Sequence, residues 1–443
     1  TLGCKVNQYE TDAMEEILEK NGYDIVSFKE TADVYIINTC SVTNMADRKS
    51  RQMIHRAKKN NPDAVIVAAG CYVQAAEKEM AEKNMADILV GNNKKKDIAQ
   101  ILEEYFAVKA VKEEQQVPLV SEVIDINHTK EYEDLTIHKV NEHTRAYIKI
   151  QDGCNQFCSY CIIPYTRGRI RSKNPEEVIE EVKNLAAQGY KEIVLTGIHL
   201  SSYGKDLGDI TLLDVIQRIQ QIEDIERIRL GSLEPRIITE QFVKELRACD
   251  KVCPHFHLSL QSGCDETLKR MNRKYTTEEY ETALNILRTY YEHPALTTDV
   301  IAGFVGETEE EFEKTRAYLE KINLYEMHIF KYSVREGTRA QKMSGHVPEQ
   351  VKTERSDILL AMAKRHKSEF EKWYVGRKEK VLLEEIVEKN GKKYFQGYTA
   401  HYVKVAVELS ENDTKLRQNE VIVVDIQGFI DENLLYGKVS IEF

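Results

Sequence analysis

The sequence has little of several features that whole classes of protein require. Eight prolines and 21 glycines in 443 residues exclude a collagen or a mucin-like stalk, and a hydrophobic share of 42% excludes a wholly disordered chain. A membrane helix needs about 20 consecutive apolar residues, whereas the apolar stretch at 65–73 is short and includes Gly70 and Cys71. No basic-then-apolar leader opens the sequence. We therefore expect a cytoplasmic protein without a membrane partner.

Positive charge is also scarce, because 62 lysines and arginines face 73 aspartates and glutamates, a net charge of −11. Such a chain is a poor candidate for coating DNA, so we expect no DNA partner, but a local basic patch could still bind RNA. The nine cysteines are an odd number. In a cytoplasmic chain they favour metal or redox chemistry over a framework of disulfides.

The length allows about three domains of roughly 150 residues each. Short β-branched runs at 33–38 and 64–69 predict buried parallel strands. Helical patterns surround them at 12–21, 46–60 and 74–84. We therefore predict a doubly wound α/β domain over residues 1–105. Residues 106–142 lack a clean period and predict a connection that can add a strand.

A second β/α series fills residues 143–374. Its six predicted strands are at 146–151, 192–196, 227–231, 255–260, 297–302 and 327–332. Its five intervening helices are predicted at 175–188, 212–222, 239–248, 276–291 and 307–322, and a long helix follows at 349–374. This alternation predicts a partial (β/α)6 barrel, short of the eight strands of a closed one.

The pattern changes again at residues 375–443. Five short strands without intervening helices are predicted at 380–387, 393–397, 403–408, 421–428 and 436–442. This series predicts a small OB-like β-barrel, a fold that often binds single-stranded RNA.

Cys154, Cys158 and Cys161 form a C-x3-C-x2-C motif just after the first predicted barrel strand. β/α barrels place their active sites at that end of the strands. Three thiolates so close together can hold three irons of a [4Fe-4S] cluster and leave the fourth iron open to a ligand. The alternatives are a zinc site, which usually takes four ligands and often a second C-x2-C pair, and chance clustering.

Three other cysteines are distant in sequence but follow strands in the same way. Cys40 and Cys71 come directly after the strands near 34–39 and 65–70, and Cys4 follows what would be a first strand. That strand is cut short at Thr1, so we expect a few residues to precede the sequence. The carboxyl ends of parallel strands share one edge of a sheet, which predicts a second cluster there. The alternative is three independent buried cysteines.

The remaining cysteines show no such convergence. Cys249 ends a predicted helix, Cys253 precedes a strand and Cys264 follows it. We interpret them as packing residues. The twelve histidines likewise show no spacing typical of metal ligands or of a catalytic triad.

The motif of the barrel cysteines resembles that of the radical S-adenosylmethionine superfamily. The opening TLGCKVNQYET, the segment IPYTRGR at 163–169 and the terminal barrel further resemble a methylthiotransferase over essentially the whole chain. The resemblance implies two [4Fe-4S] clusters, with S-adenosylmethionine bound to the open iron of the barrel cluster and cleaved to a 5′-deoxyadenosyl radical. It also implies an external electron donor, a sulfur donor and a terminal RNA-binding TRAM domain.

The family has three arms, and the opening GCKVNQ and the segment GIHLSSYG at 197–204 most resemble one of them. That arm methylthiolates carbon 2 of N6-threonylcarbamoyladenosine beside the anticodon of tRNA. The isopentenyladenosine arm tends to show GCQMN, and the arm that acts on an aspartate of a ribosomal protein tends to show GCPKN. An alternative of another class is a non-catalytic iron–sulfur sensor that binds RNA.

Five residues at predicted strand ends are candidates for contact with S-adenosylmethionine. They are Thr196, Gly197, Gln261, Ser262 and Gly303. Glycine permits close backbone approach, and the side chains of Gln261 and Ser262 could bond ribose hydroxyls. The family motif around Gly303 usually has a proline where this sequence has Val305.

Two basic groups and one mixed group are candidates for RNA contact. The first two, expected on the open face of the barrel, are Arg167, Arg169, Arg171 and Lys173 after the cysteine motif and Arg273 with its neighbours Arg270 and Lys274. In the terminal barrel, Lys393, Tyr398 and Lys404 have the composition of a stacking platform. The alternatives are a solvated charged loop for the first groups and barrel core for the aromatics.

Overall fold

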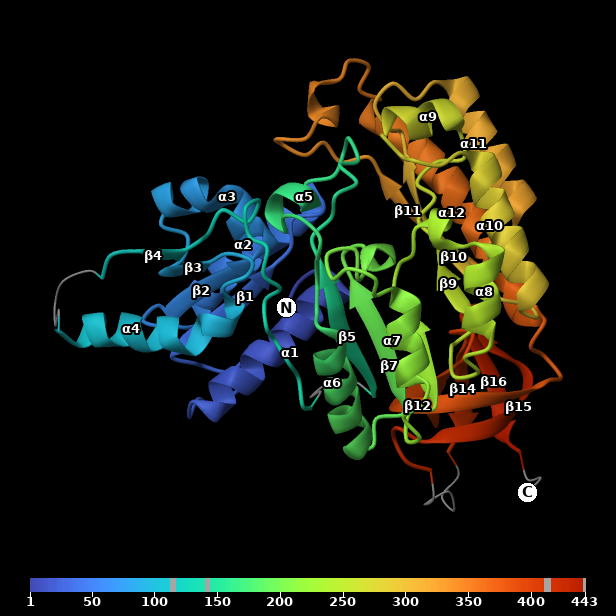
Figure 1. Ribbon diagram of the computed structural model, residues 1–443, viewed down its shortest axis with the longest axis horizontal. Helices are drawn as coiled ribbons and strands as arrows, with labels where there is room; N and C mark the ends of the chain where they lie inside the picture. Colours follow the sequence, from blue (N-terminus) through green and yellow to red (C-terminus); the bar gives the residue numbers. More distant parts are fainter. Residues whose placement is uncertain (112–116, 140–143, 410–415, 441–443) are drawn as a thin grey trace.

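The computed structural model describes residues 1–111, 117–139, 144–409 and 416–440, which form three regions (Figure 1). The first contains a parallel sheet in the order β1 (Val34–Thr39), β2 (Val65–Gly70), β3 (Ile88–Val90), β4 (Val120–Glu122). Its helices are α1 (Lys5–Lys20), α2 (Asn44–Asn60), α3 (Cys71–Glu82) and α4 (Ile98–Val111), with a 3-10 turn at Lys95–Asp97.

Both faces of this sheet are covered, as a doubly wound fold requires. Ile66 and Ala68 of β2 pack with residues of α2 and α3, whereas Val65, Val67 and Ala69 pack with residues of α1 and α4. The predicted fold of this region is therefore confirmed. The strand that we expected from the connection is β4, while α4 continues past the predicted boundary at residue 105.

The middle region is a half-barrel of six parallel strands. They are β5 (Arg145–Asp152), β7 (Glu192–Gly197), β8 (Arg227–Leu230), β9 (His255–His257), β10 (Ala295–Ala302) and β11 (Glu326–Lys331). Single parallel bridges such as Leu233 to Leu258 join the β5-β7-β8 sheet to the β9-β10-β11 sheet. The short β6 (Arg171–Ser172) pairs antiparallel with β5. The partial barrel predicted from the sequence is confirmed.

The helices of this region cover the convex side of the half-barrel (Figure 1). They are α6 (Pro175–Ala187), α7 (Leu212–Ile219), α8 (Glu240–Arg247), α10 (Thr277–Tyr290), α11 (Glu309–Ile322) and α12 (Glu349–Lys372). The connections contain short α5 (Ile163–Thr166), which lies against α3, short α9 (Asp265–Arg270), and 3-10 turns at Leu200–Ser202, Pro235–Ile237 and Ala340–Lys342. Reciprocal capping boxes at Thr211, Thr276 and Thr308 fix where α7, α10 and α11 begin.

Alternation along the strands separates a convex core from a concave face. Leu296, Val300 and Ala302 of β10 belong to the main core, whereas Asp299 and Ile301 are only half-buried and lie on the opposite face. We call that concave face the lumen.

The terminal region is a closed barrel of β12 (Lys378–Lys389), β13 (Lys392–Thr399), β14 (Lys404–Glu408), β15 (Val421–Asp431) and β16 (Leu434–Val439). The predicted five-stranded barrel is confirmed, although the end of the last predicted strand lies outside the described residues. Arg227 and Arg229 of β8 donate hydrogen bonds to the carbonyls of Tyr398 and Ala400, both at 2.9 Å. These bonds attach the terminal barrel beneath the half-barrel. No helix in the described ranges is long and apolar enough to cross a membrane.

Candidate active site at two cysteine triplets

The barrel triplet lies on the loop that follows β5. Gly153 starts the loop with φ +70°, and a Cβ there would overlap the carbonyl oxygen of Arg169, so only glycine fits. The amide of Cys154 donates to the carbonyl of Gly168 at 3.0 Å, and the amide of Cys161 donates to the carbonyl of Cys158 at 3.0 Å. These bonds fold the loop back on itself.

The three thiols of this barrel triplet affect one another electrostatically. Burial first, and then the neighbouring Cys158, raise the pKa of Cys154 to about 11. Burial, with Cys158 and Cys154, raises the pKa of Cys161 to about 12. Nη1 of Arg273 donates to Sγ of Cys158 at 3.2 Å. The site therefore disfavours free thiolates, and bound cationic iron would compensate their charge.

A single metal ion fits the triplet less well than a cluster does. Tetrahedral zinc with bonds of about 2.3 Å would hold sulfurs roughly 4 Å apart. Among the described residues, the group of three ligand-type residues whose donor atoms lie within 4.8 Å of one another is His257, Asp299 and His328. The wider cysteine triplet, without a fourth protein ligand in the motif, suits a four-iron cube with one open position.

The structure also brings Cys4, Cys40 and Cys71 together. Cys4 caps α1, Cys40 follows β1 and Cys71 begins α3 directly after β2. The amide of Leu2 donates to the carbonyl of Asn38 at 3.0 Å, which places the segment before Cys4 beside β1. Burial first, and then the nearby Cys71 and Cys4, raise the pKa of Cys40 to about 11.

One buried arginine joins the two triplets. Nε of Arg167 donates to Sγ of Cys71 at 3.2 Å, and its Nη atoms donate to both carboxylate oxygens of Glu10 at 2.7 and 3.0 Å. Its Nη2 also donates to Asn7, and its Nη1 to Asp152, two residues before Cys154. The guanidinium therefore spans from a sulfur of the N-terminal triplet to the strand that carries the barrel triplet.

The carboxylates around this arginine are held ionised. Burial opposes ionisation of Glu10, but Arg167, Lys149 and Lys95 together keep its pKa well below its usual range. Asp152 is also kept ionised, because Arg167 and Lys149 lower its pKa by more than burial raises it. The interface between the first two regions is thus a buried network of paired charges.

This network corrects part of the sequence prediction. We expected Arg167, Arg171 and Lys173 on the open face, but their exposed fractions are 0%, 1% and 0%. Lys173 donates to Glu181 at 2.7 Å. The prediction of RNA contact is wrong for these three, because buried carboxylates pair with them, Glu10 with Arg167, Asp152 with Arg171 and Glu181 with Lys173. Arg169 is exposed, with its guanidinium 4.5 Å from the ring centroid of Phe157.

Arg273 also serves the site and not a solvent surface. It is half-buried, and it bonds both the sulfur of Cys158 and the carbonyl of Ser259. We therefore assign it to the barrel triplet. Its neighbour Arg270 pairs with Glu311 at 2.5 Å.

Three of the residues proposed for S-adenosylmethionine stay candidates at strand ends. Thr196 and Gly197 end β7, where a Cβ on Gly197 would lie 2.9 Å from Gln151. The sequence reasoning missed Gln151, whose amide donates to the carbonyl of Gly153 and whose Oε1 accepts from the amide of His199. Gln261 is 8% exposed with φ +75°.

The other two residues have different roles. The Ser262 hydroxyl is fully buried and hydrogen-bonds with Thr315 at 3.2 Å, so it does not reach a ribose and that prediction is wrong. Gly303 lies against Lys352 of α12, whose Cγ would be only 2.5 Å from a Cβ at this position. Its lack of a side chain therefore serves packing.

The terminal-barrel candidates lie partly against the half-barrel. The Tyr398 ring stacks on Tyr402 at 4.7 Å, and the guanidinium of Arg145 lies 5.0 Å from its centroid. Lys404 contacts the same ring at 5.5 Å, whereas Lys393 is exposed.

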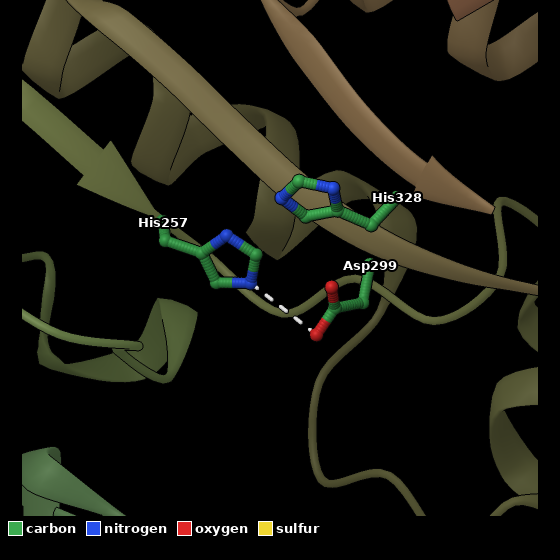
Figure 2. A group of neighbouring side chains, drawn as sticks. All are labelled: His257, Asp299 and His328. Atoms are coloured by element: carbon green, nitrogen blue, oxygen red, sulfur yellow. Dashed lines mark ion pairs between the residues drawn. The ribbon is translucent and has the colours of Figure 1, made fainter. Parts of the chain in front are cut away.

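A group that the sequence gave no reason to expect lies in the lumen. His257, Asp299 and His328 come from three adjacent strands and point toward one another (Figure 2). Parallel register, which spacing along the chain does not reveal, brings them together. Cys249, Cys253 and Cys264 are buried, as expected of packing residues.

Comparisons with known proteins agree with this geometry. Residues 1–91 match a family described as uncharacterized protein family UPF0004, and residues 148–319 match the radical SAM superfamily. A radical S-adenosylmethionine methyltransferase of Kitasatospora setae, TsrM, shares the fold with a TM-score of 0.54 and 15% identity, over 73% of this chain and 70% of that one. Membership of the superfamily implies a [4Fe-4S] cluster and S-adenosylmethionine as cofactors.

Curated relatives cover nearly the whole chain. The threonylcarbamoyladenosine tRNA methylthiotransferase MtaB of Bacillus subtilis is 41% identical over 93% of this chain and 90% of its own length. The enzyme of the same name from Thermotoga maritima is 38% identical over 91% of this chain and 89% of its own length. A tRNA-2-methylthio-N(6)-dimethylallyladenosine synthase of Clostridium botulinum is 36% identical over 87% of this chain and 85% of its own length. The chain belongs to the tRNA methylthiotransferase family of radical S-adenosylmethionine enzymes.

Proposed function

We propose that this enzyme installs a methylthio group on carbon 2 of N6-threonylcarbamoyladenosine beside the anticodon of tRNA. The observation that carries the proposal is the pair of cysteine triplets, one on the barrel and one on the N-terminal sheet, with Arg167 bonded to Cys71 on one side and to Asp152 on the other. The curated relatives named for this substrate support the choice of adenosine. Methylthiolation of isopentenyladenosine is the second candidate, favoured by the relatives at 36% identity.

Each triplet has its own part in this proposal. Cys154, Cys158 and Cys161 hold the [4Fe-4S] cluster that faces S-adenosylmethionine. Cluster and S-adenosylmethionine, when bound, supply a carbon radical able to remove hydrogen from an unactivated C–H bond. Cys4, Cys40 and Cys71 would hold a second [4Fe-4S] cluster, whose open iron would keep the sulfur source within reach of the substrate.

The chain's own side chains hold and tune these sites. The positively charged guanidinium of Arg273 donates a hydrogen bond to the sulfur of Cys158, and that of Arg167 donates one to the sulfur of Cys71. Such charge-assisted hydrogen bonds stabilise sulfur in its anionic form. The bonds of Gln151 to the carbonyls of Asp152 and Gly153 hold the start of the cysteine loop against β5.

The other regions and partners complete the proposal. Residues 1–105 form the sulfur-delivery domain, 106–142 the connection, 143–374 the radical domain and 375–443 a TRAM-like RNA-binding barrel. Exposed Lys393 and Arg169, with half-buried Tyr398 and Lys404, are the proposed tRNA contacts. A reductant protein and a sulfur donor supply the enzyme in the cytoplasm.

Nucleoside mass spectrometry tests the proposal. Anaerobically reconstituted enzyme is incubated with S-adenosylmethionine, a reductant and tRNA carrying threonylcarbamoyladenosine or isopentenyladenosine. We expect a methylthio mass gain on the first nucleoside. A gain only on isopentenyladenosine would contradict the proposed substrate. Absence of any gain, with 5′-deoxyadenosine still formed, would point to the ribosomal-protein substrate. Absence of both products would favour a non-catalytic RNA-binding sensor.

A further inference from the structure

The lumen triad of His257, Asp299 and His328 has no role in the site described so far. Its donor atoms lie within 4.8 Å of one another (Figure 2). Asp299 of β10 is in register with His328 of β11, and His257 of β9 is in register with Thr297, two residues earlier on β10. Because alternate residues of a strand share a face, all three side chains project from the same wall.

Two members of the triad hold each other in place. Nε2 of His257 lies 3.3 Å from a carboxylate oxygen of Asp299, and its Nδ1 lies 3.0 Å from the hydroxyl of Thr297. The ring of His328 stacks on that of His257 with centroids 5.9 Å apart. The side chain of His328 is exposed and has no hydrogen bond or ion pair within the described part of the chain. Its ring nitrogens can therefore meet a ligand.

A short chain of contacts relates the triad to the barrel cysteines. Arg273 donates to Sγ of Cys158 and also to the carbonyl of Ser259. Ser259 comes two residues after His257, which corresponds to about 7 Å along a strand. The triad thus lies deeper in the same lumen than the barrel cysteines.

Positive charge predominates around this part of the lumen. His255, the lumen residue before His257, has its pKa held well below the usual range by burial first, and then by the charges of Arg229, Lys5 and His257. Nζ of Lys5 lies 5.7 Å from the ring centroid of Tyr147 and has no carboxylate partner among the described residues. Such a field favours an anionic guest.

We infer that His257, Asp299 and His328 form the subsite for the N6 substituent of the target adenosine, and that they select a polar, anionic substituent over an apolar one. The inference rests on the proposed function. The threonylcarbamoyl group carries a carboxylate, a hydroxyl and amide groups, whereas the isopentenyl group carries none of these. Carbon 2 of adenine and the carbon that bears N6 flank the same ring nitrogen. A base held with carbon 2 at the cluster therefore keeps its substituent in the same lumen.

The polar character of the triad determines the direction of selectivity. An apolar substituent packed against it would leave polar atoms without hydrogen-bond partners, which disfavours its binding. Two histidines and a carboxylate are also a set of metal ligands. The charges of Lys5 and Arg229 oppose a cation here, and His257 already pairs with Asp299. We therefore favour the substituent.

The test compares RNA binding by the holoenzyme and its variants. The probes are two anticodon stem–loops of one sequence, carrying either threonylcarbamoyladenosine or isopentenyladenosine at the target position. We expect the wild type to bind the first at least tenfold more tightly, and His328→Ala to abolish that preference. His328→Gln, which can still donate a hydrogen bond, should restore part of it. His128→Ala, an exposed histidine that pairs only with Asp125, is the matched control and should keep the full preference.

The outcomes separate this inference from the proposed function. If the wild type forms the methylthio product but His328→Ala keeps the binding preference, the subsite is overturned and the proposed function stands. If the preference exists and is lost in His328→Ala but no product forms, the subsite is supported and the proposed reaction is contradicted. A stoichiometric divalent metal other than iron, present in the wild type and absent from His328→Ala, would overturn the subsite in favour of a metal centre.

Discussion

At the scale of single residues, the most consequential side chain is Arg167. Its guanidinium makes a fork to Glu10 and also reaches Cys71. Lysine carries the same charge but cannot reproduce that fork. Breaking one partner of a buried pair costs about 3–5 kcal/mol.

Arg167→Lys should therefore lower the melting temperature of the apo chain and reduce the iron held by the N-terminal triplet. Thermal unfolding and iron content per chain measure the two effects. The matched control is Arg169→Lys, two residues away and exposed, which should leave both unchanged and only weaken tRNA binding. If the two variants behaved alike, with tRNA affinity as the main loss, the buried role of Arg167 would be disproved.

At the scale of elements, the cysteine loop depends on Gly153. Gly153→Ala would force a left-handed φ on alanine and push its Cβ into the carbonyl of Arg169. We expect the variant to lose the barrel cluster, so that it binds about half as much iron as the reconstituted wild type. It should also fail to cleave S-adenosylmethionine. Gly208→Ala is the control, because φ there is +87° but a Cβ would meet nothing within 4 Å. It should cost only about 1 kcal/mol of stability. Full cleavage activity in Gly153→Ala would contradict this reading of the loop.

Element-scale features were also those that the sequence predicted well. Strand ends could be located from β-branched runs, so the positions of Cys40 and Cys71 on one sheet edge followed from local pattern. The lumen triad could not be predicted in this way. His257, Asp299 and His328 meet only because β9, β10 and β11 adopt one particular register. The burial of the basic run after Cys161 could not be predicted for a related reason, since Glu10, the partner of Arg167, lies far away in the chain.

At the scale of the whole molecule, buried charge holds the terminal barrel beneath the half-barrel. Arg227 and Arg229 bond carbonyls of the terminal barrel, and Glu192 pairs with Arg229 at 2.7 Å. Burial alone would raise the pKa of Glu192, but Arg229 and Arg227 outweigh it and lower the pKa to about 2 from 4.5. Because the folded pKa is depressed, the stabilisation is present above pH 4.5 and is lost as pH falls toward 2.

Glu192→Gln should therefore destabilise the apo chain at neutral pH, by about 3 kcal/mol from that pKa shift. It should also flatten the dependence of stability on pH between 4.5 and 2. Chemical denaturation at several pH values measures both. The exposed Glu176, which pairs with Arg218, offers the control Glu176→Gln, for which we expect little change. An unchanged pH dependence in Glu192→Gln would contradict the role of this buried pair.

The central claim is that the two cysteine triplets do separate work on one substrate. It is tested most directly by measuring 5′-deoxyadenosine and methylthiolated nucleoside in the same reaction for Cys71→Ala, beside Cys158→Ala and the packing-cysteine control Cys249→Ala. We predict that Cys71→Ala still cleaves S-adenosylmethionine but makes no methylthio product, that Cys158→Ala makes neither product, and that Cys249→Ala makes both. Methylthiolated nucleoside from Cys71→Ala at the wild-type level would contradict the account.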